Sequence, residues 1–167
     1  MDSKKWGSNP PDLYPKMLGQ LIANIATLEL SLRVVIYLRE VPIEQRQPVA
    51  ERLTSLRAGD TLEISALTSW DSLGELIAKY NLHNPSATVP EDIKDLRDAF
   101  AHGRILADNP TSDLKLVRFS KPKGGSVTVE LAQTMSIEWM GEQIHKIHDM
   151  AETVQRRIRE LSAPRFD

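Results

Sequence analysis

The residues best suited to chemistry are an arginine, an aspartate and a histidine in one short segment: Arg97, Asp98 and His102. An arginine side chain offers a planar, permanently charged fork that matches a phosphate group. A histidine titrates near neutral pH and suits general acid–base chemistry. One such pair can cleave RNA without a metal, because the base removes the 2′-OH proton and the arginine stabilises the charge that builds on phosphorus.

The segment is predicted to be helical, and the helix sets where these side chains point. Successive residues rotate by about 100°, so four of them share one face, taken as the core: Ile93, Leu96, Phe100 and Gly103. Arg97 then lies about 80° from the centre of that face and His102 about 140° away, on the outer side. Asp98, four residues before His102, can reach the imidazole. Arg104 falls on the same flank as Arg97, as a supporting residue. Spacing alone also fits an arginine and a histidine on a solvated helix face.

Two further histidines, His145 and His148, are three residues apart in a predicted helix, a spacing that can hold a metal ion. The chain has no cysteine and no obvious third ligand beside them, so solvated histidines are the favoured interpretation. No glycine-rich phosphate loop precedes a helix. The sequence therefore predicts neither a metal nor a cofactor.

Helices must position these groups, and hydrophobic periodicity predicts most of them. Long helices are expected over residues 11–39 and 136–161, each with apolar residues at three- and four-residue steps. Between them we expect a short helix over residues 43–56, weakened by Pro48, and a helix capped by Ser69 that runs to Leu82. The helix with Arg97 is expected to start at Thr88, with Glu91 in the capping-box position.

A different period follows the Arg97 helix. Apolar residues alternate with polar ones on both sides of a turn at Gly124 and Gly125: Leu114, Leu116, Phe119, Val127, Val129 and Leu131. This pattern is typical of a β-hairpin, which we place at residues 113–132. The predicted fold class is mainly α, with a small β-hairpin inserted before the C-terminal helix.

Composition bounds the class of protein. A chain of 167 residues, 41 % hydrophobic and 26 % charged, suits one globular domain, with residues 1–10 as a flexible start. The absence of cysteine excludes disulfides, Cys-ligated zinc and thiol catalysis. A net charge of −2 argues against non-specific binding along nucleic acid, although a local phosphate cleft stays compatible with it.

The sequence predicts a cytoplasmic protein with no membrane segment. No apolar signal region follows the N-terminus. The longest apolar stretch, around residues 28–38, contains Glu29 and Arg33, which makes it too short and too charged to span a bilayer.

The segment Leu96-Arg97-Asp98-Ala99-Phe100-Ala101-His102-Gly103 resembles the Arg-x4-6-His motif of HEPN domains (higher eukaryotes and prokaryotes nucleotide-binding). The polar Asp98 directly after the arginine fits the family. An acidic residue in a long first helix, Glu29, is similar to the family too, as is the order of the helices, with a long one at the C-terminus. The hairpin looks like an insertion.

The resemblance implies one HEPN-like helical bundle over residues 1–167 that forms a homodimer through the motif helices. In catalytic members of the family, paired Arg and His residues form a single RNase cleft. Carried over to this chain, Arg97 binds or stabilises the phosphate, His102 is the acid–base group, Asp98 orients it, and Glu29 pairs with Arg97. The implied activity is a metal-independent endoribonuclease that leaves a 2′,3′-cyclic phosphate, of the toxin or phage-defence kind, with RNA as substrate and an antitoxin or other protein as partner.

Two alternatives stay open. The family also contains members that do not cut RNA, so the chain could be a non-catalytic dimeric module that binds a nucleotide or a partner protein. The acidic balance and the lack of an extended basic stripe suit this interpretation. The other alternative is a purely structural helical protein in which Arg97 and His102 form surface ion pairs.

Overall fold

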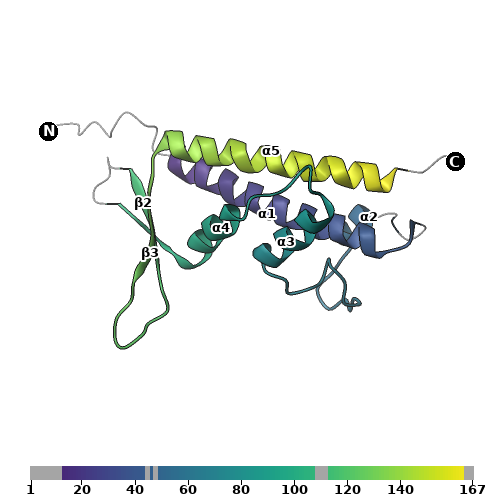
Figure 1. Ribbon diagram of the computed structural model, residues 1–167, viewed down its shortest axis with the longest axis horizontal. Coiled ribbons are helices and arrows are strands. Elements are labelled where there is room, and N and C mark those ends of the chain that lie inside the picture. The colour runs from purple at the N-terminus through teal and green to yellow at the C-terminus, as the bar shows by residue number, and fades with distance from the viewer. Residues whose placement is uncertain (1–12, 44–45, 47–48, 108–112, 164–167) are drawn as a thin grey trace. The chain divides into compact units, whose positions relative to one another are not determined.

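The structure, a computed structural model, describes residues 13–43, 46, 49–107 and 113–163 (Figure 1). These residues form the helices α1 (Leu13–Glu40), α2 (Val49–Thr54), α3 (Leu73–His83), α4 (Asp92–His102) and α5 (Ile137–Ser162). The strands are β1 (Arg104–Leu106), β2 (Leu114–Phe119) and β3 (Val129–Met135). The chain is thus mainly helical with a small antiparallel sheet, as predicted. The expected flexible start at residues 1–10 lies outside the described residues.

The chain divides into two compact units, which we describe one at a time. The first unit comprises Met1–Ile25 and Asp92–Ile147, and the second comprises Ala26–Glu91 and His148–Asp167. The first unit therefore holds the start of α1, the whole of α4, the sheet and the start of α5.

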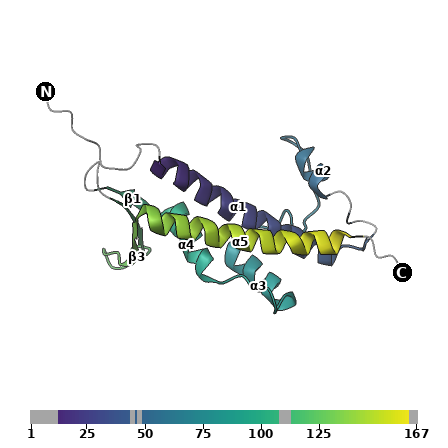
Figure 2. The same cartoon turned by 90° about the horizontal axis from the view of Figure 1, so that it is seen from above.

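The core of the first unit joins α1, α4, β2, β3 and α5. Its centre is a cluster of side chains with no exposed surface, from α4, β2, β3 and α5: Ala99, Leu116, Met135 and Met140. Leu96 and Phe100 of α4 pack against this cluster, and Ile93 is 2 % exposed, which confirms the predicted core face of the helix. Figure 2 shows the starts of α1 and α5 side by side, where Asn24 Nδ2 donates a 3.1 Å hydrogen bond to the carbonyl oxygen of Ile144.

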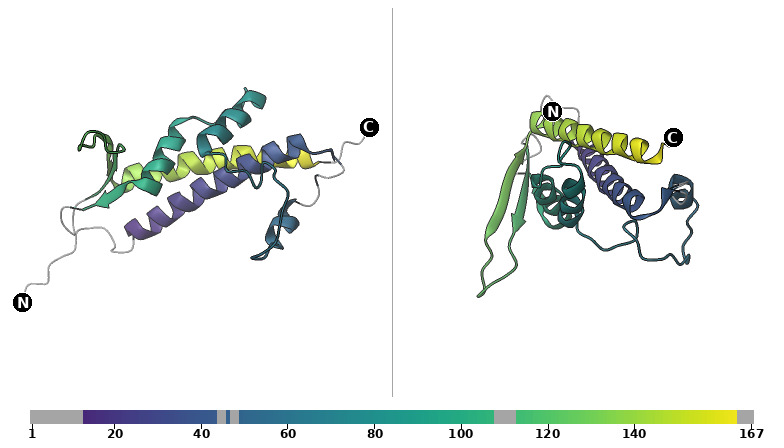
Figure 3. Two further views of the ribbon diagram at one scale, coloured as in Figure 1. Left: turned by 90° about the horizontal axis from the view of Figure 1, so that it is seen from below. Right: turned by 45° about the vertical axis from the view of Figure 1, so that its right-hand side comes forward.

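The sheet has the order β1-β2-β3, and both pairs of neighbours are antiparallel. The long β2–β3 hairpin closes at Gly124 and Gly125, whose φ angles of 59° and 80° lie in the region that glycine adopts without strain. Its two strands run side by side to a tip that lies away from α5 (Figure 3). The prediction of the hairpin is confirmed in kind but wrong in extent, because β3 continues to Met135 and β1 adds a third strand that was not expected.

In the second unit, the start of α3 differs from the prediction. Ser72, and not Ser69, is the N-cap: its Oγ accepts a hydrogen bond from Glu75 N, and the Glu75 carboxylate accepts one from Ser72 N at 2.7 Å. Ser69 has other partners, since its carbonyl oxygen accepts a 2.8 Å bond from Arg33 Nη1 and its hydroxyl donates to Asp71 Oδ2 at 2.8 Å.

The helix with Arg97 begins at Asp92, so the predicted capping box at Thr88 and Glu91 is wrong. Both backbone polar groups of the intervening Val89 are bound by the Asn81 side chain, whose Oδ1 accepts from Val89 N and whose Nδ2 donates to Val89 O, each at 2.8 Å. Val89 is also 2 % exposed. These two bonds hold Val89 outside the helix, which starts three residues later.

The second predicted helix is also shorter than expected. The structure has only the six residues Val49–Thr54 in α2, where a helix over residues 43–56 was predicted. This helix begins directly after Pro48 in the sequence, as expected for a residue that disrupts a helix interior and is tolerated at a start.

The apolar helix α1 qualifies as a candidate membrane span, contrary to the expectation from Glu29 and Arg33. Its 28 residues are long and apolar enough to cross a membrane, judged by length and composition only. In the structure, 56 % of the qualifying window is buried, as in the core helix of a soluble protein, and a signal sequence near an N-terminus passes the same test. Cytoplasmic location without a membrane segment stays a prediction.

Candidate active site

Three of the predicted site residues lie on α4, in the first unit. His102 is the last residue of the helix and is exposed, while Arg97 keeps 33 % of its side-chain surface accessible. His102 lies five positions after Arg97, so the two side chains leave the helix about 140° apart. A single copy of α4 therefore presents the guanidinium and the imidazole in different directions.

Asp98 pairs with its neighbour in the sequence. Arg97 Nη1 lies 3.0 Å from Asp98 Oδ1, in an ion pair whose two side chains are about one-third exposed. In the part of the chain that the structure describes, no hydrogen bond joins Asp98 to the His102 ring. The expectation that Asp98 orients the imidazole stays a prediction, and the structure assigns the carboxylate to Arg97.

Arg104 does not share a helical flank with Arg97, because it is the first residue of β1. Its Nη1 donates to the carbonyl oxygens of His102 at 3.2 Å and Gly103 at 3.1 Å. Basic side chains commonly satisfy the last carbonyl groups of a helix in this way. Arg104 thus closes the end of α4 that carries His102.

Glu29 lies in the second unit, where its Oε1 accepts from Arg33 Nη2 at 3.1 Å. Arg97 belongs to the first unit. The proposed pair between Glu29 and Arg97 stays a prediction.

Gly103 fixes the direction in which the chain leaves His102. Its N–H donates to the carbonyl oxygen of Ala99 at 2.7 Å, and a Cβ at this position would collide with that same oxygen and lie 2.9 Å from the carbonyl oxygen of Val117. The next residue, Arg104, pairs with Val117 in the sheet. The paired residues of β1 and β2 thus begin two positions after His102 and two positions before Phe119.

An open groove of about 1060 Å³ lies between α4 and the hairpin. Asp95, Asp98 and His102 line its helical side, where spacings of three and four residues place them on one face of α4. The hairpin side carries three cationic residues, one aromatic residue and several polar ones: Arg118, Phe119, Ser120, Lys121, Lys123, Ser126, Thr128 and Glu130. Of the predicted site residues, the groove brings together His102 and Asp98.

Arg118 ties the two sides of this groove together. Its Nη2 lies 3.7 Å from Asp95 Oδ1, its Nη1 donates to the carbonyl oxygen of Asp95 at 3.4 Å, and its Nε lies 3.3 Å from Glu130 Oε2. The sequence analysis missed this residue. The available signal was a charged side chain between two apolar ones, Val117 and Phe119.

The other two cations on the hairpin side of the groove, Lys121 and Lys123, differ from Arg118 in the part of the chain that the structure describes. Arg118 is shared by Asp95 and Glu130, and Asp98 is paired with Arg97. Lys121 and Lys123 are exposed, and neither ammonium forms an ion pair within the described residues. The positive charge of the groove therefore resides at the hairpin, a short distance along the chain from Phe119.

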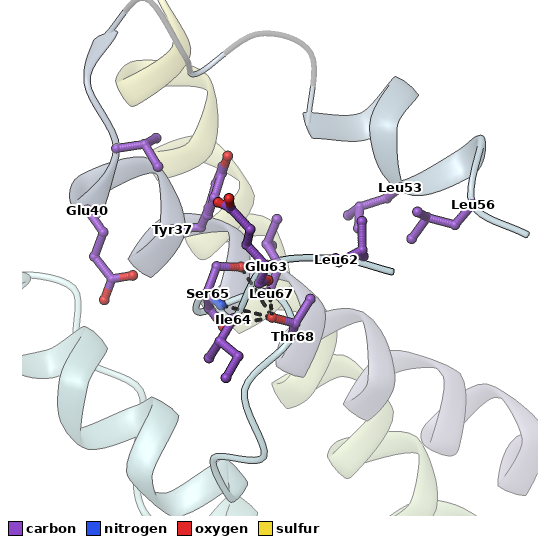
Figure 4. Close-up of a pocket in the computed structure, with 11 residues that line it drawn as sticks. Tyr37, Glu40, Leu53, Leu56, Leu62, Glu63, Ile64, Ser65, Leu67 and Thr68 are labelled. Carbon is purple, nitrogen blue, oxygen red and sulfur yellow. Dashed lines mark hydrogen bonds between the residues drawn. The ribbon is translucent and has the colours of Figure 1, made fainter. Parts of the chain in front are cut away.

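The second unit has a smaller hollow of about 280 Å³, lined by the end of α1, α2 and residues 62–68 (Figure 4). Its polar atoms bind one another: Thr68 Oγ1 accepts from Ser65 N at 2.8 Å and donates to the carbonyl oxygen of Glu63 at 3.0 Å. None of the predicted site residues lines it. Across the residues that the structure describes, no three His, Asp or Glu side chains gather as metal ligands.

Comparisons with protein-family models, with curated proteins and with solved structures each gave no match to this chain. Membership of the HEPN family therefore rests on the resemblance of residues 96–103 and stays a prediction.

Proposed function

We propose that this chain is a metal-independent endoribonuclease of the HEPN type that acts as a homodimer. The observation that carries the proposal is the position of His102 at the exposed end of α4, beside a groove whose other wall bears Lys121 and Lys123. No hydrogen bond occupies the His102 ring within the described residues. An uncommitted imidazole next to uncompensated positive charge suits proton transfer on a phosphodiester.

A second copy of the chain completes the proposed site. Because Arg97 and His102 leave α4 about 140° apart, one helix cannot direct both at the same phosphate. Two copies that meet across a two-fold axis can bring Arg97 of one chain towards His102 of the other. The exposed surface of α4 around Ala101 and His102 is the face proposed for this contact.

The proposed reaction is a transesterification that converts a linear phosphodiester of RNA into a cyclic one. His102 takes the proton of a ribose 2′-OH, the 2′-oxygen attacks the adjacent phosphorus, and the bond from phosphorus to the 5′-oxygen breaks. The leaving 5′-oxygen takes up a proton, which gives a 2′,3′-cyclic phosphate and a 5′-hydroxyl. Arg97 stabilises the negative charge that builds on the phosphoryl oxygens.

The test is cleavage of transfer RNA and total cellular RNA in the presence of EDTA. The wild-type chain is expected to cut and to leave cyclic phosphate ends, and His102→Ala is expected to lower the rate by about 100- to 10,000-fold. His145→Ala is the matched control, because His145 is another exposed histidine of the first unit that lies outside the groove. If the wild-type chain cuts no RNA and His102→Ala changes no growth phenotype on expression, the proposal is wrong.

A non-catalytic dimeric module that binds a nucleotide or a partner protein is the second candidate. One observation favours it: Asp98 is paired with Arg97, which leaves the His102 imidazole without an orienting carboxylate. This candidate predicts a stable dimer in which Arg97→Ala abolishes ligand binding while no cleavage is measurable in either form. Cleavage that depends on Arg97 would exclude it as the full account.

A further inference from the structure

We propose that the β2–β3 hairpin is the substrate-binding arm of this site, and that Phe119, Lys121 and Lys123 hold an unpaired stretch of RNA next to His102. This inference rests on the proposed ribonuclease function and assigns the class of RNA that the site accepts. The hairpin spans residues 114–135, all in the first unit, and the binding surface is its side that lines the groove.

Geometry places the arm beside the reacting group. His102 and Phe119 line the same groove, and the pairing of Arg104 with Val117 fixes the end of α4 beside β2. Lys121 and Lys123 follow Phe119 towards the tip and line the groove as well. A strand of RNA with one phosphate at His102 therefore passes directly along these three side chains.

The charge pattern favours a phosphate backbone as the ligand. Arg118, deeper in the groove, is 19 % exposed and is held by Asp95 and Glu130, so it supports the arm. Lys121 and Lys123 are exposed and have no ion pair within the described part of the chain. Two lysines at alternate positions of an extended segment suit contacts to successive phosphates, which are the main source of affinity for nucleic acids.

The aromatic residue favours an unpaired base. Phe119 is 43 % exposed at the end of a strand, so part of its ring is accessible from the groove. Aromatic side chains that face solvent beside cationic ones are the usual platform on which single-stranded bases stack. A base inside a duplex is already stacked and cannot reach such a ring, so double-stranded RNA is a poor ligand for this arm.

Two serine hydroxyl groups near the tip already form hydrogen bonds within the hairpin. Ser120 Oγ donates to the carbonyl oxygen of Lys121 at 3.1 Å and accepts from Thr128 N at 3.0 Å. Ser126 Oγ donates to the carbonyl oxygen of Lys123 at 3.0 Å. Groups that serve the turn in this way do not read base edges, so these two serines give the arm little preference for sequence.

The binding test uses a fluorescein-labelled oligouridylate of about 12 nucleotides, a length that covers a groove of this kind, and the His102→Ala chain, which does not consume the probe. Fluorescence anisotropy compares Lys121→Ala/Lys123→Ala with Lys16→Ala/Lys115→Ala in that background. The control pair removes the same charge from exposed lysines of the first unit that lie outside the groove. Equal urea midpoints establish that the two variants are folded alike.

We expect the groove pair to weaken binding by about tenfold or more at low salt, and its log Kd against log salt slope to fall by about 1.4, which is 0.7 for each lost phosphate contact. The control pair is expected to stay within about twofold of its parent, because its charges lie outside the groove. Equal Kd values for the two double variants would overturn the inference, as would equal affinity for a blunt RNA duplex.

Phe119→Leu tests stacking separately. Loss of a base-stacking ring weakens binding by about 5- to 150-fold, whereas Val127→Ala, which also trims an exposed apolar residue of the hairpin, should leave Kd unchanged. Retained affinity in Phe119→Leu would remove the stacking role.

The two proposals fail in different ways. If wild-type protein cleaves RNA and the lysine pair binds as well as its control, the arm is wrong and the ribonuclease stands. If binding depends on Lys121 and Lys123 but no RNA is cut, the ribonuclease is wrong and the arm remains as a binding element.

Discussion

Gly103 passes so close to Val117 that a Cβ atom on the glycine would lie 2.9 Å from the Val117 carbonyl oxygen. This contact joins the end of α4 to the middle of β2, and it is the point at which the helix with His102 meets the hairpin. The position demands a residue without a side chain, because the carbonyl of Ala99 closes it from the helix side as well.

Gly103→Ala is therefore expected to destabilise the chain by about 1–3 kcal/mol through overpacking against backbone atoms. Gly19→Ala is the matched control. Gly19 lies inside α1 with no neighbouring atom within 4 Å of an added Cβ. Gly19→Ala should raise the free energy of unfolding by about 0.5–1 kcal/mol, because alanine favours a helix. Urea unfolding with unchanged slope measures both values. A Gly103→Ala chain as stable as wild type would show that α4 and β2 can separate.

Arg118 is expected to hold the hairpin against α4. Arg118→Met keeps the apolar stem and removes the guanidinium that joins Asp95 and Glu130. Because both carboxylates are about half exposed, the loss of stability should be small, about 1 kcal/mol. Hydrogen exchange of the β2 and β3 amides should nevertheless accelerate. Lys115→Met, on the same strand but exposed, should leave exchange unchanged, and equal exchange in both variants would contradict the role of Arg118.

The dimer proposed for α4 can be tested by disulfide cross-linking, because the chain has no cysteine and a single introduced one is then unique. Ala101 is exposed beside His102, so Ala101→Cys is expected to form disulfide-linked dimers under mild oxidation if two α4 helices meet. Ala78→Cys, exposed on α3, should stay monomeric on a non-reducing gel. Cross-linking of Ala78→Cys alone would place the contact elsewhere.

Arg33 is expected to be the most sensitive polar position of the second unit. Its guanidinium is 14 % exposed and donates to the carbonyl oxygens of Ser69 and Asp71, each at 2.8 Å, and to Glu29 at 3.1 Å. Arg33→Met should lower the free energy of unfolding by about 3 kcal/mol, because these partly buried acceptors lose a charged donor. Arg33→Lys should restore little, since an ammonium cannot make the same fork. Urea unfolding and limited proteolysis at residues 61–71 measure the effect, and an unchanged protease pattern in Arg33→Met would contradict it.

Stability should fall in acid, partly through Asp71. Hydrogen bonds from Lys79 Nζ and Ser69 Oγ, both 2.8 Å from Asp71 Oδ2, lower the pKa of this carboxyl group. A carboxyl whose pKa is lower in the folded chain stabilises it above the unfolded pKa of about 3.9, and this contribution is lost as the pH falls through the lowered value.

Asp71→Asn is therefore expected to be less stable at pH 7 and to lose less stability between about pH 5 and pH 2. Some slope should remain, because the backbone N–H of Ser72 also lowers the pKa of Glu75. The exposed Asp149→Asn serves as the control. Parallel curves of unfolding free energy against pH for wild type and Asp71→Asn would contradict the assignment.

Where periodicity is strong, the fold could be predicted from the sequence. The apolar stripes of α1 and α5 and the core face of α4 were predicted. Each of these helices buries one face, so its apolar residues recur at three- and four-residue steps. The starts of α3 and α4 could not be placed in the same way. Ser69 has the correct residue type for a cap, but the carboxylate that completes the capping box stands three residues after Ser72.

Long-range hydrogen bonds account for the other misses. Asn81 binds both backbone polar groups of Val89, and no local pattern around Thr88 reveals that partner. β1 has only three residues, all exposed, so alternation could not mark it. At the site, His102 and Arg97 were predicted from their residue types. Asp98 can reach either of them by its spacing, and its pairing with Arg97 depends on side-chain geometry that spacing does not fix.

The hairpin separates the residues that fold this chain from those that would give it selectivity. Its buried side chains, Leu116, Val117 and Met135, lie near the base, while residues 121–130 are all exposed. An exchange of the tip for a longer or differently charged one would therefore alter the wall facing His102 without reaching the core. Substitutions confined to this turn would therefore change which ligands the groove binds while the core stays the same. The same segment is a suitable place to engineer a different binding preference.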